Sequence, residues 1–154
     1  MLLLGSNLGR RVRTVRDALD RLASETEVRA VSRMYASEPS GRPFQPWFLN
    51  VAARVATPMS PWELLAVAKR LERDAGRRAG VRWGPRPLDV DIILMGEATV
   101  SGPDLTIPHA SMAYRRFCLL PVAEVAAEMV VPPGGRTVAE MLSTCEDKLE
   151  VTPI

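Results

Sequence analysis

The sequence predicts an α+β sandwich in which a mainly antiparallel sheet is covered by helices on one face. Three observations support this class: strand patterns alternate with two amphipathic helical patterns, one strand shows strict apolar alternation, and turn residues separate the elements. The chain has 154 residues, of which 47% are hydrophobic and 25% charged. This length and composition predict one globular domain over residues 1–154.

A strand and a helix are expected at the start of the chain. Residues 2–4 are apolar and predict a short strand that ends at the turn 5–9, where Asn7 is expected to hold neighbouring backbone. Apolar residues then recur at the spacing of an amphipathic helix, at Val12, Val15, Leu19 and Leu22. Residues 27–37 read as extended chain, and the proline and glycine content of residues 38–43 predicts a loop.

The middle of the chain predicts a long strand and a second helix. Side chains alternate between the two faces of a strand, so residues 47–57 place Leu49, Val51, Ala53 and Val55 on one face and Phe48, Asn50, Ala52 and Arg54 on the other. Ser60 is a good N-cap, proline suits the next position, and Glu63 completes a capping box. Gly76 is the expected end of this helix.

Residues 88–94 predict a buried strand because they are apolar apart from two aspartates. The resulting order, strand–helix–strand–strand–helix–strand, is that of two split β-α-β units and predicts a ferredoxin-like sandwich. The rest of the chain adds a short strand near residues 98–100 and helices at 121–129 and 137–145. We therefore expect a β-α-β-β-α-β core with an extra C-terminal strand and helices.

Charge and composition narrow the class of protein. The net charge of +2 does not indicate a nucleic-acid-binding domain, which is usually strongly basic. No apolar run approaches the ~18 residues that a membrane span needs, and the first residues lack the pattern of a signal peptide. Two cysteines, Cys118 and Cys145, lie far apart without a metal-ligand pattern. We expect a cytoplasmic monomer that binds neither nucleic acid nor membranes.

Asp89 and Asp91 are the first candidates for chemistry. Residues two apart on a strand share a face, so both carboxylates project together, while Val90 and Ile92 turn into the core. Two neighbouring carboxylates repel each other unless a positive charge lies between them, and Mg²⁺ commonly shares one or two carboxylates with substrate phosphates. The alternative is a solvated strand edge whose acids pair with arginines, but carboxylates within an apolar run need a partner.

Arginines crowd the chain just before this strand. They are Arg73, Arg77, Arg78, Arg82 and Arg86. Guanidinium groups bind phosphate through two parallel hydrogen bonds and keep their charge at working pH, so arginines beside a pair of aspartates predict a metal–polyphosphate site. A solvated loop with little energetic value is the alternative for the arginines.

Two other segments contain candidate binding residues. On the long strand, Phe48 and Asn50 share a face, and a ring beside a carboxamide suits a flat heterocycle with a polar edge. A second hydrophobic layer is the alternative. His109 is the one histidine, and a lone histidine is more often a structural residue than a catalyst. The spacing of Arg115 and Phe117 is consistent with one strand face.

With these segments identified, the sequence resembles the 6-hydroxymethyl-7,8-dihydropterin pyrophosphokinase family of folate biosynthesis over nearly the whole chain. The most specific match is the string at residues 82–92, Arg-Trp-Gly-Pro-Arg-Pro-Leu-Asp-Val-Asp-Ile. The other matching blocks, in the family's order, are residues 5–9, residues 37–39 with 45–50, and residues 107–109 with Arg115 and Phe117. The resemblance implies the ferredoxin-like fold and transfer of pyrophosphate from ATP to the pterin hydroxymethyl group, with release of AMP.

The resemblance also implies roles for individual residues. Asp89 and Asp91 would bind two Mg²⁺ ions that bridge the ATP phosphates, and together with Arg78 and Arg86 they form the expected catalytic set. The expected ATP-binding residues are Arg77, Arg82, Trp83, Arg86, Ile92, Thr106, His109 and Arg115. The expected pterin-binding residues are Ser37, Pro39, Ser40, Phe48, Asn50 and Phe117. Which of Arg77, Arg78 and Arg82 closes on the phosphates stays open, as does the proton acceptor.

Some positions depart from the family pattern. The loop at residues 76–83 is about one residue shorter than the family's, and Lys69 and Asp104 stand where a neutral amide and a basic residue are expected. A ferredoxin-like RNA-binding module is the alternative function, and a catalytically inactive regulatory domain is a third. The RNA-binding module is disfavoured because Asp89 and Asp91 would repel a nucleic-acid backbone. The inactive regulatory domain is disfavoured because both aspartates and Arg86 are present.

Overall fold

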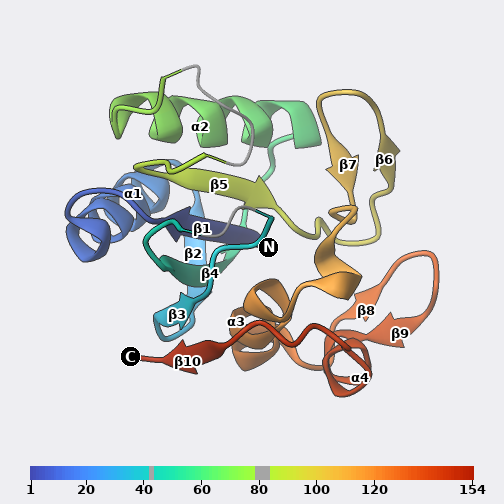
Figure 1. The fold of residues 1–154 in the computed structure, drawn as a ribbon. Helices are drawn as coiled ribbons and strands as arrows, with labels where there is room; N and C mark the ends of the chain where they lie inside the picture. The colour runs from blue at the N-terminus through green and yellow to red at the C-terminus, as the bar shows by residue number, and fades with distance from the viewer. Residues whose placement is uncertain (42–43, 79–83) are drawn as a thin grey trace.

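A computed structural model describes residues 1–41, 44–78 and 84–154 (Figure 1). The elements in chain order are β1 (Leu2–Ser6), α1 (Arg11–Glu25), β2 (Glu27–Val31), β3 (Tyr35–Ser37), β4 (Phe48–Ala56), α2 (Pro61–Asp74), β5 (Asp89–Ile92), β6 (Val100–Ser101), β7 (Thr106–Ile107), the 3₁₀ helix η1 (Met112–Tyr114), α3 (Arg116–Ala126), β8 (Val130–Val131), β9 (Arg136–Thr137), α4 (Val138–Ser143) and β10 (Val151–Pro153).

The main sheet has six strands that all pair antiparallel. Its order is β10-β3-β4-β1-β5. Strand β2 pairs with the same edge of β4 as β3 does, but nearer the C-terminal end of β4. The predicted α+β core with an antiparallel sheet is confirmed. The register places Gly5 of β1 opposite Asn50 of β4 on one side and Asp89 of β5 on the other, so three of the segments that the sequence singled out meet at one end of the sheet.

The extended segment predicted over residues 27–37 is divided into β2 and β3, which both run along β4. Ser32 lies at the break. Its backbone N–H donates to the carbonyl of Ala52 at 2.9 Å, and its hydroxyl accepts from the N–H of Ala52 at 2.9 Å. The hydroxyl therefore replaces a missing strand carbonyl, so the edge of β4 stays satisfied across the break.

Helices α1 and α2 cover one face of the sheet (Figure 1). Helix α2 starts as predicted, because the hydroxyl of Ser60 accepts from the N–H of Glu63 at 3.3 Å and the Glu63 carboxylate accepts from the N–H of Ser60 at 2.7 Å. Gly76 follows the helix with a φ of 87°, a conformation that favours glycine. The core on this face includes Leu2, Leu4, Val15, Leu22, Leu49, Val51, Leu64, Leu71, Val90 and Ile92.

The expectation that helices cover only one face is wrong. Helices α3 and α4 pack on the opposite face, where they form a second core with Met1, Leu3 and Ala52 (Figure 1). The physical reason is that Leu3 and Ala52 make this face apolar as well, so it needs a cover of its own. Strands β1 and β4 are therefore buried on both faces, and α3 approaches the sheet from the side opposite to α2.

The placement of Arg115 and Phe117 on a strand is also wrong. Arg115 is the N-cap of α3, and Phe117 lies in its first turn. The helix predicted at 121–129 runs from Arg116 to Ala126, with Pro121 inside it. A spacing of two residues does not distinguish a strand from the start of a helix. Pro121 was expected at the start of the helix, but it lies within α3.

The remaining C-terminal elements are close to their predicted positions. Helix α4 lies within the predicted 137–145, and the strand expected near 98–100 is β6, which pairs with β7. Strand β10 adds the last strand to the sheet beside β3. Among the described residues, no helix is long and apolar enough to cross a membrane.

Candidate active site

A cavity of about 310 Å³ opens at the end of the sheet where β1, β4 and β5 meet α3. Side chains of both charges and several rings face it. Its lining residues are Leu3, Gly5, Ser37, Glu38, Ser40, Phe48, Asn50, Lys69, Arg77, Arg86, Asp89, Asp91, Ile93, His109, Ser111, Arg115, Phe117 and Cys118. The cavity therefore joins segments from all along the chain, including most of the residues that the sequence nominated.

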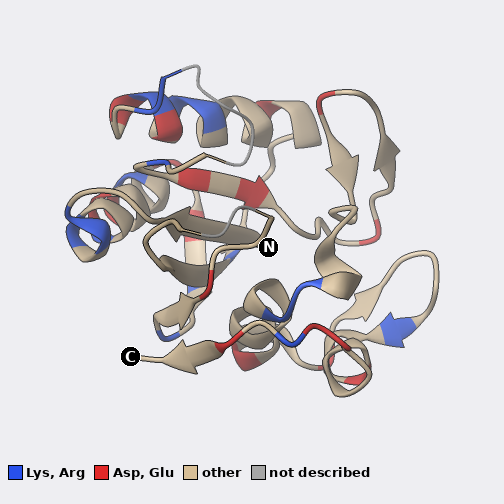
Figure 2. Ribbon diagram, viewed as in Figure 1, with Lys and Arg blue, Asp and Glu red and all other residues tan. Residues whose placement is uncertain are grey.

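Asp89 and Asp91 project into this cavity from β5, on the same face, as the spacing predicts. Val90 and Ile92 alternate with them and are buried in the core on the α2 side. The acidic strand lies beside the basic end of α2 and the segment that follows it (Figure 2). Because β1 pairs with β5, Gly5 lies next to Asp89, and its missing side chain leaves the space between the aspartate and β4 open.

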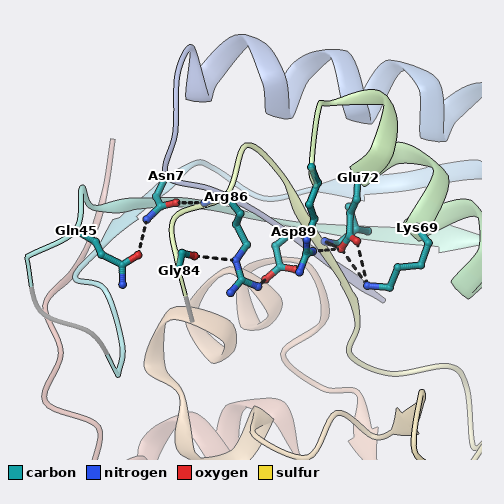
Figure 3. A network of polar contacts seen from close by, with 9 residues as sticks. Asn7, Gln45, Lys69, Glu72, Gly84, Arg86 and Asp89 are labelled. Carbon is teal, nitrogen blue, oxygen red and sulfur yellow. Dashed lines mark hydrogen bonds and ion pairs between the residues drawn. The ribbon is translucent and has the colours of Figure 1, made fainter. Parts of the chain in front are cut away.

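Two arginines hold Asp89. Arg77 makes an ion pair with its Oδ1, and the Nη1 of Arg86 lies 2.7 Å from its Oδ2. Figure 3 shows Arg86 in the middle of this network, where its Nε also donates to the carbonyl of Gly84 at 3.3 Å. Both guanidinium groups keep N–H donors beyond those that contact Asp89, so they can bind an anion in the cavity while they remain near the carboxylate.

Asn7 holds the backbone at Arg86, which is distant in the sequence, whereas the sequence predicted that Asn7 would hold backbone near its own turn at residues 5–9. Its Oδ1 accepts from the backbone N–H of Arg86 at 2.8 Å, and its Nδ2 donates to the Oε1 of Gln45 at 3.4 Å and to the carbonyl of Pro46 at 3.3 Å (Figure 3). One side chain thus ties the arginine segment before β5 to the loop before β4.

Glu72 is a functional-site residue that the sequence reasoning missed. It lies on α2 with only 3% of its surface exposed, and its carboxylate accepts from the N–H of Val90 at 3.0 Å. It also pairs with Arg77 at 2.5 Å and with Lys69 at 3.1 Å (Figure 3). Glu72 therefore holds the peptide between the two aspartates together with two cavity cations. The available signal was an acid next to Leu71 on the apolar stripe of a helix.

Asp91 lacks comparable support. Its carboxylate makes no hydrogen bond or ion pair with any other residue in the described part of the chain. Burial, with the repulsion of Asp89 added to it, raises the pKa of Asp91 to about 7. Burial also lowers the pKa of His109, against a smaller opposing effect of Asp89. A cation next to Asp91 would favour its ionised form.

The residues present fit a magnesium ion that is shared with a polyphosphate. Across residues 1–41, 44–78 and 84–154, no group of three or more metal-ligating side chains comes together. The wall of the cavity instead offers the two carboxylates of Asp89 and Asp91. Mg²⁺ commonly takes one or two protein carboxylates and completes its octahedron with water and substrate phosphates.

The other end of the cavity is lined by rings and an amide. Asn50 is only 2% exposed, and its Nδ2 donates to the hydroxyl of Ser37 at 2.8 Å. Phe48 on β4 and Phe117 on α3 line the same cavity from the sheet and from the helix. A Cβ at Gly5 would lie 3.3 Å from the Oδ1 of Asn50 and 3.8 Å from the ring of Phe48, so the glycine keeps this end open.

Arg115 contacts the loop after β3, where its guanidinium donates to the hydroxyl of Ser40. Both residues line the cavity. The loop whose Ser40 the family resemblance nominates for pterin binding is therefore connected to the start of α3. The structure brings together eleven of the nominated residues in one cavity, namely Ser37, Ser40, Phe48, Asn50, Arg77, Arg86, Asp89, Asp91, His109, Arg115 and Phe117.

Four nominated residues do not line the cavity. Ile92 is 3% exposed and points into the core, because it lies on the opposite face of β5 from the aspartates; Ile93 lines the cavity in its place. Thr106 is exposed on the β6–β7 hairpin, and Pro39 and Arg78 are also absent from the lining. The nominated Arg82 and Trp83 lie outside the described residues.

Several lining residues were not individually nominated for the site from the sequence. They are Leu3, Glu38, Ile93, Ser111 and Cys118. Burial raises the pKa of the Cys118 thiol, so this side chain acts as an apolar wall and not as a nucleophile. Lys69, noted as a departure from the family pattern, reaches the cavity, whereas the other departure, Asp104, does not line it.

The molecule is an antiparallel α+β sandwich whose cavity has two aspartates at one end, one of them held by two arginines, and two rings with an amide at the other. This arrangement suits the transfer of a phosphate-containing group to a flat ring compound. The family model described as 7,8-dihydro-6-hydroxymethylpterin-pyrophosphokinase (HPPK) matches residues 1–127. The chain belongs to this family.

Individual relatives agree with this membership. The chain is 41% identical over 145 residues to the 2-amino-4-hydroxy-6-hydroxymethyldihydropteridine pyrophosphokinase of Pseudomonas aeruginosa, covering 92% of this chain and 88% of the relative. It is 39% identical over 142 residues to the protein of the same name from Methylorubrum extorquens, covering 91% and 89%. The fold is similar to that of the wild-type Plasmodium falciparum HPPK-DHPS structure, with a TM-score of 0.66, 14% identity, and coverage of 92% of this chain and 42% of that one.

Proposed function

We propose that this chain transfers the pyrophosphoryl group of ATP to the hydroxymethyl group of 6-hydroxymethyl-7,8-dihydropterin in folate biosynthesis. Membership of the HPPK family and the names of relatives that align over nearly the whole chain support this activity. In the reaction, the hydroxyl oxygen forms a bond to the β-phosphorus of ATP, and the bond between that phosphorus and the α–β bridging oxygen breaks. The products are the pterin diphosphate, AMP and the hydroxyl proton.

The ring end of the cavity would bind the pterin. Phe48 and Phe117 offer aromatic faces for stacking, and the carboxamide of Asn50 can pair with the donor and acceptor edge of the ring. The hydrogen bond from Asn50 Nδ2 to Ser37 leaves the Oδ1 of Asn50 as an acceptor toward the ligand. Burial of this amide strengthens such pairing, because a pterin that failed to bond it would leave a desolvated polar group.

The carboxylate end would bind the ATP phosphates with magnesium. Asp89 and Asp91 would hold the ions, of which the family resemblance implies two, and bound Mg²⁺ would neutralise charge that develops on the phosphates. Arg77 and Arg86 are held at this end by Asp89 and can donate to phosphate oxygens from the same positions. Phosphoryl-type transfer depends on positioning and charge neutralisation more than on covalent catalysis, and this set of residues supplies both.

One observation carries the proposal: the β1 register places Gly5 between Asn50 and Asp89. A pterin that is hydrogen-bonded to Asn50 would therefore lie next to the carboxylates of β5, because Gly5 has no side chain to separate them. An RNA-binding module has no need for this arrangement, since two carboxylates in the cavity would repel a phosphodiester backbone. We also propose a monomeric cytoplasmic protein without nucleic-acid partners, as the sequence predicts.

The direct test is release of AMP from ATP, measured with and without 6-hydroxymethyl-7,8-dihydropterin and with and without Mg²⁺. We expect AMP and the pterin diphosphate in equal amounts only when pterin and Mg²⁺ are both present. ATP turnover that does not depend on the pterin, or no turnover under any of these conditions, would remove the assignment. Asp91→Ala is expected to lose turnover with an unchanged circular dichroism spectrum, whereas the exposed Asp17→Ala is the matched control with unchanged turnover.

A further inference from the structure

The two phenylalanines of the ring end come from different elements. Phe48 belongs to β4, whereas Phe117 belongs to α3, which covers the sheet from the other side of the cavity. The width of the slot between them therefore depends on how closely α3 is held to the sheet. A stacked ring tolerates little variation in this distance, since dispersion contacts weaken within an ångström of separation.

Glu124 connects α3 to the sheet. Its Oε2 accepts from the hydroxyl of Tyr35 on β3 at 2.6 Å, and its Oε1 accepts from the backbone N–H and the Nε of Arg33 at 3.1 Å and 3.2 Å. The guanidinium of Arg33 also lies 5.8 Å from the ring centre of Tyr35. Among the described residues, these are the hydrogen bonds that join α3 directly to β3 and the segment before it.

Both ends of this connection lead to the ring slot. Glu124 follows Phe117 by seven residues, about two helical turns, so the two side chains lie on the same side of α3. Tyr35 pairs with Asn50 in the sheet register, and it shares a strand face with Ser37, whose hydroxyl accepts from Asn50. Tyr35 is only 4% exposed, so its hydroxyl has few other partners than Glu124 and Arg33.

From this arrangement we propose that Tyr35 and Glu124 are positioning residues for the pterin, because their hydrogen bond sets the separation of Phe117 from Phe48 and Asn50. This inference rests on the proposed function. Neither side chain lines the cavity, so they act through the residues that do. Their effect is expected mainly at the ring end, because Asp89, Asp91, Arg77 and Arg86 belong to β5 and the segments next to it, whereas Arg115 is the expected ATP-binding residue that adjoins α3.

The test compares Tyr35→Phe, Glu124→Ala and Glu124→Gln with the wild-type chain in steady-state kinetics, with pterin and ATP varied in turn. Tyr35→Phe removes the hydrogen bond between Tyr35 and Glu124, and Glu124→Ala removes this bond together with those from Arg33. Each variant is expected to raise the KM for the pterin about threefold to tenfold. The KM for ATP and the kcat are expected to stay within about twofold of the wild type, since the phosphate end is unchanged. Glu128→Ala is the matched control, an exposed acid two residues beyond the end of α3.

Two further readouts separate positioning from a general loss of stability. Glu124→Gln keeps an acceptor for the Tyr35 hydroxyl and is expected to recover most of the pterin KM. The double variant Tyr35→Phe/Glu124→Ala is expected to have a pterin KM no higher than that of Glu124→Ala alone. The reason is that Glu124→Ala already removes the hydrogen bond that Tyr35→Phe would break. Equal increases in the KM for pterin and for ATP, or an unchanged pterin KM in active variants, would overturn this inference alone. A wild-type chain without pterin-dependent turnover would overturn the proposed function together with it.

Discussion

Asp91 is a residue of this site that lowers the stability of the folded chain when its carboxylate is ionised. The neighbouring Asp89 is held by Arg77 and Arg86, whereas the carboxylate of Asp91 makes no hydrogen bond or ion pair within the described chain. Burial and repulsion by Asp89 raise its pKa from 3.8 to about 7. A carboxyl group whose pKa is raised in the folded state opposes folding once it ionises. The folded chain is therefore less stable while no cation is bound next to Asp91.

The pH dependence of stability should therefore reveal Asp91. Its contribution is fully present below pH 3.8, where both states are protonated, and it is lost as the pH rises through about 7. Asp91→Asn cannot ionise, so without Mg²⁺ this variant is expected to unfold at a higher temperature than the wild type at pH 8, with a smaller difference at pH 5. Each kcal/mol of relieved repulsion corresponds to about 2–4 °C in Tm for a chain of this size.

Scanning calorimetry in EDTA at the two pH values measures this difference. Asp17→Asn is the control, because Asp17 lies on α1 with 62% of its side chain exposed. A difference between Asp91→Asn and the wild type that is the same at pH 5 and pH 8 would contradict the role given to the ionised carboxylate.

Helix α3 depends on a segment that follows it far along the chain. Arg115, its N-cap, provides no side-chain hydrogen bond to the first turn. Instead the Oδ2 of Asp147 accepts from the N–H of Arg116 at 2.9 Å, while its Oδ1 accepts from the N–H of Leu149 at 3.2 Å. The tail then enters the sheet as β10 beside β3. The tail thus joins the two elements that border the ring slot.

Asp147→Ala is expected to lower the free energy of unfolding by about 1 kcal/mol, the usual effect of removing a helix N-terminal cap. Chemical denaturation with urea measures this change, and an unchanged m-value would show that the unfolded state is unaffected. Glu146→Ala is the matched control, because Glu146 is the residue next to Asp147 and its side chain is exposed. Equal stabilities of the two variants would show that the carboxylate of Asp147 does not cap α3.

The whole molecule has two cores on opposite faces of one sheet, with the cavity at the end where β1, β4 and β5 meet α3. Elements from each core supply part of the cavity wall. Phe117 comes from the α3 side, whereas Lys69 comes from α2 on the other side. A ligand that contacts both ends of the cavity therefore links the two packed layers, and its binding should stabilise the fold as a unit.

Ligand-induced stabilisation should accordingly require magnesium and nucleotide together. A non-hydrolysable ATP analogue at about 100 times its Kd with Mg²⁺ is expected to stabilise the fold by about 2.7 kcal/mol. Mg²⁺ alone is expected to have a much smaller effect, because the described residues offer it only the two carboxylates of β5. Thermal unfolding followed by circular dichroism, repeated after addition of EDTA, makes the comparison. Full stabilisation by the nucleotide in EDTA would contradict the magnesium site.

Much of the fold could be predicted because local patterns decide it. The period of two at Asp89 and Asp91 and the capping box at Ser60 depend only on residues close in sequence, and the structure confirms both geometries. The strand interpretation of Arg115 and Phe117 was wrong because a pair of residues cannot distinguish a period of 2 from one of 3.6. Coverage of the second sheet face was missed because Leu3 and Ala52 show their common face only after β1 and β4 are paired.

The candidate site divides in the same way. Its aspartates, arginines, rings and amide were nominated from residue type and spacing, and they lie within residues 1–127, which match the family model. The contacts of Glu72 with Val90, and of Tyr35 with Glu124, could not be predicted, because hydrogen-bond partners distant in sequence leave no periodic pattern. The removal of Ile92 from the cavity follows from strand alternation, which the sequence already contained.

Taken alone, the amino-acid sequence predicted the main strands and helices of the core, the family that the chain resembles and the candidate side chains for its chemistry, since these depend on local spacing and composition. Only the tertiary structure decided that Gly5 separates Asn50 from Asp89, that Asp91 lacks a partner while Asp89 has two, and that Glu124 ties α3 to β3. The physical reason is that strand order, register and long-range hydrogen bonds arise from simultaneous packing of both sheet faces, which no single segment specifies.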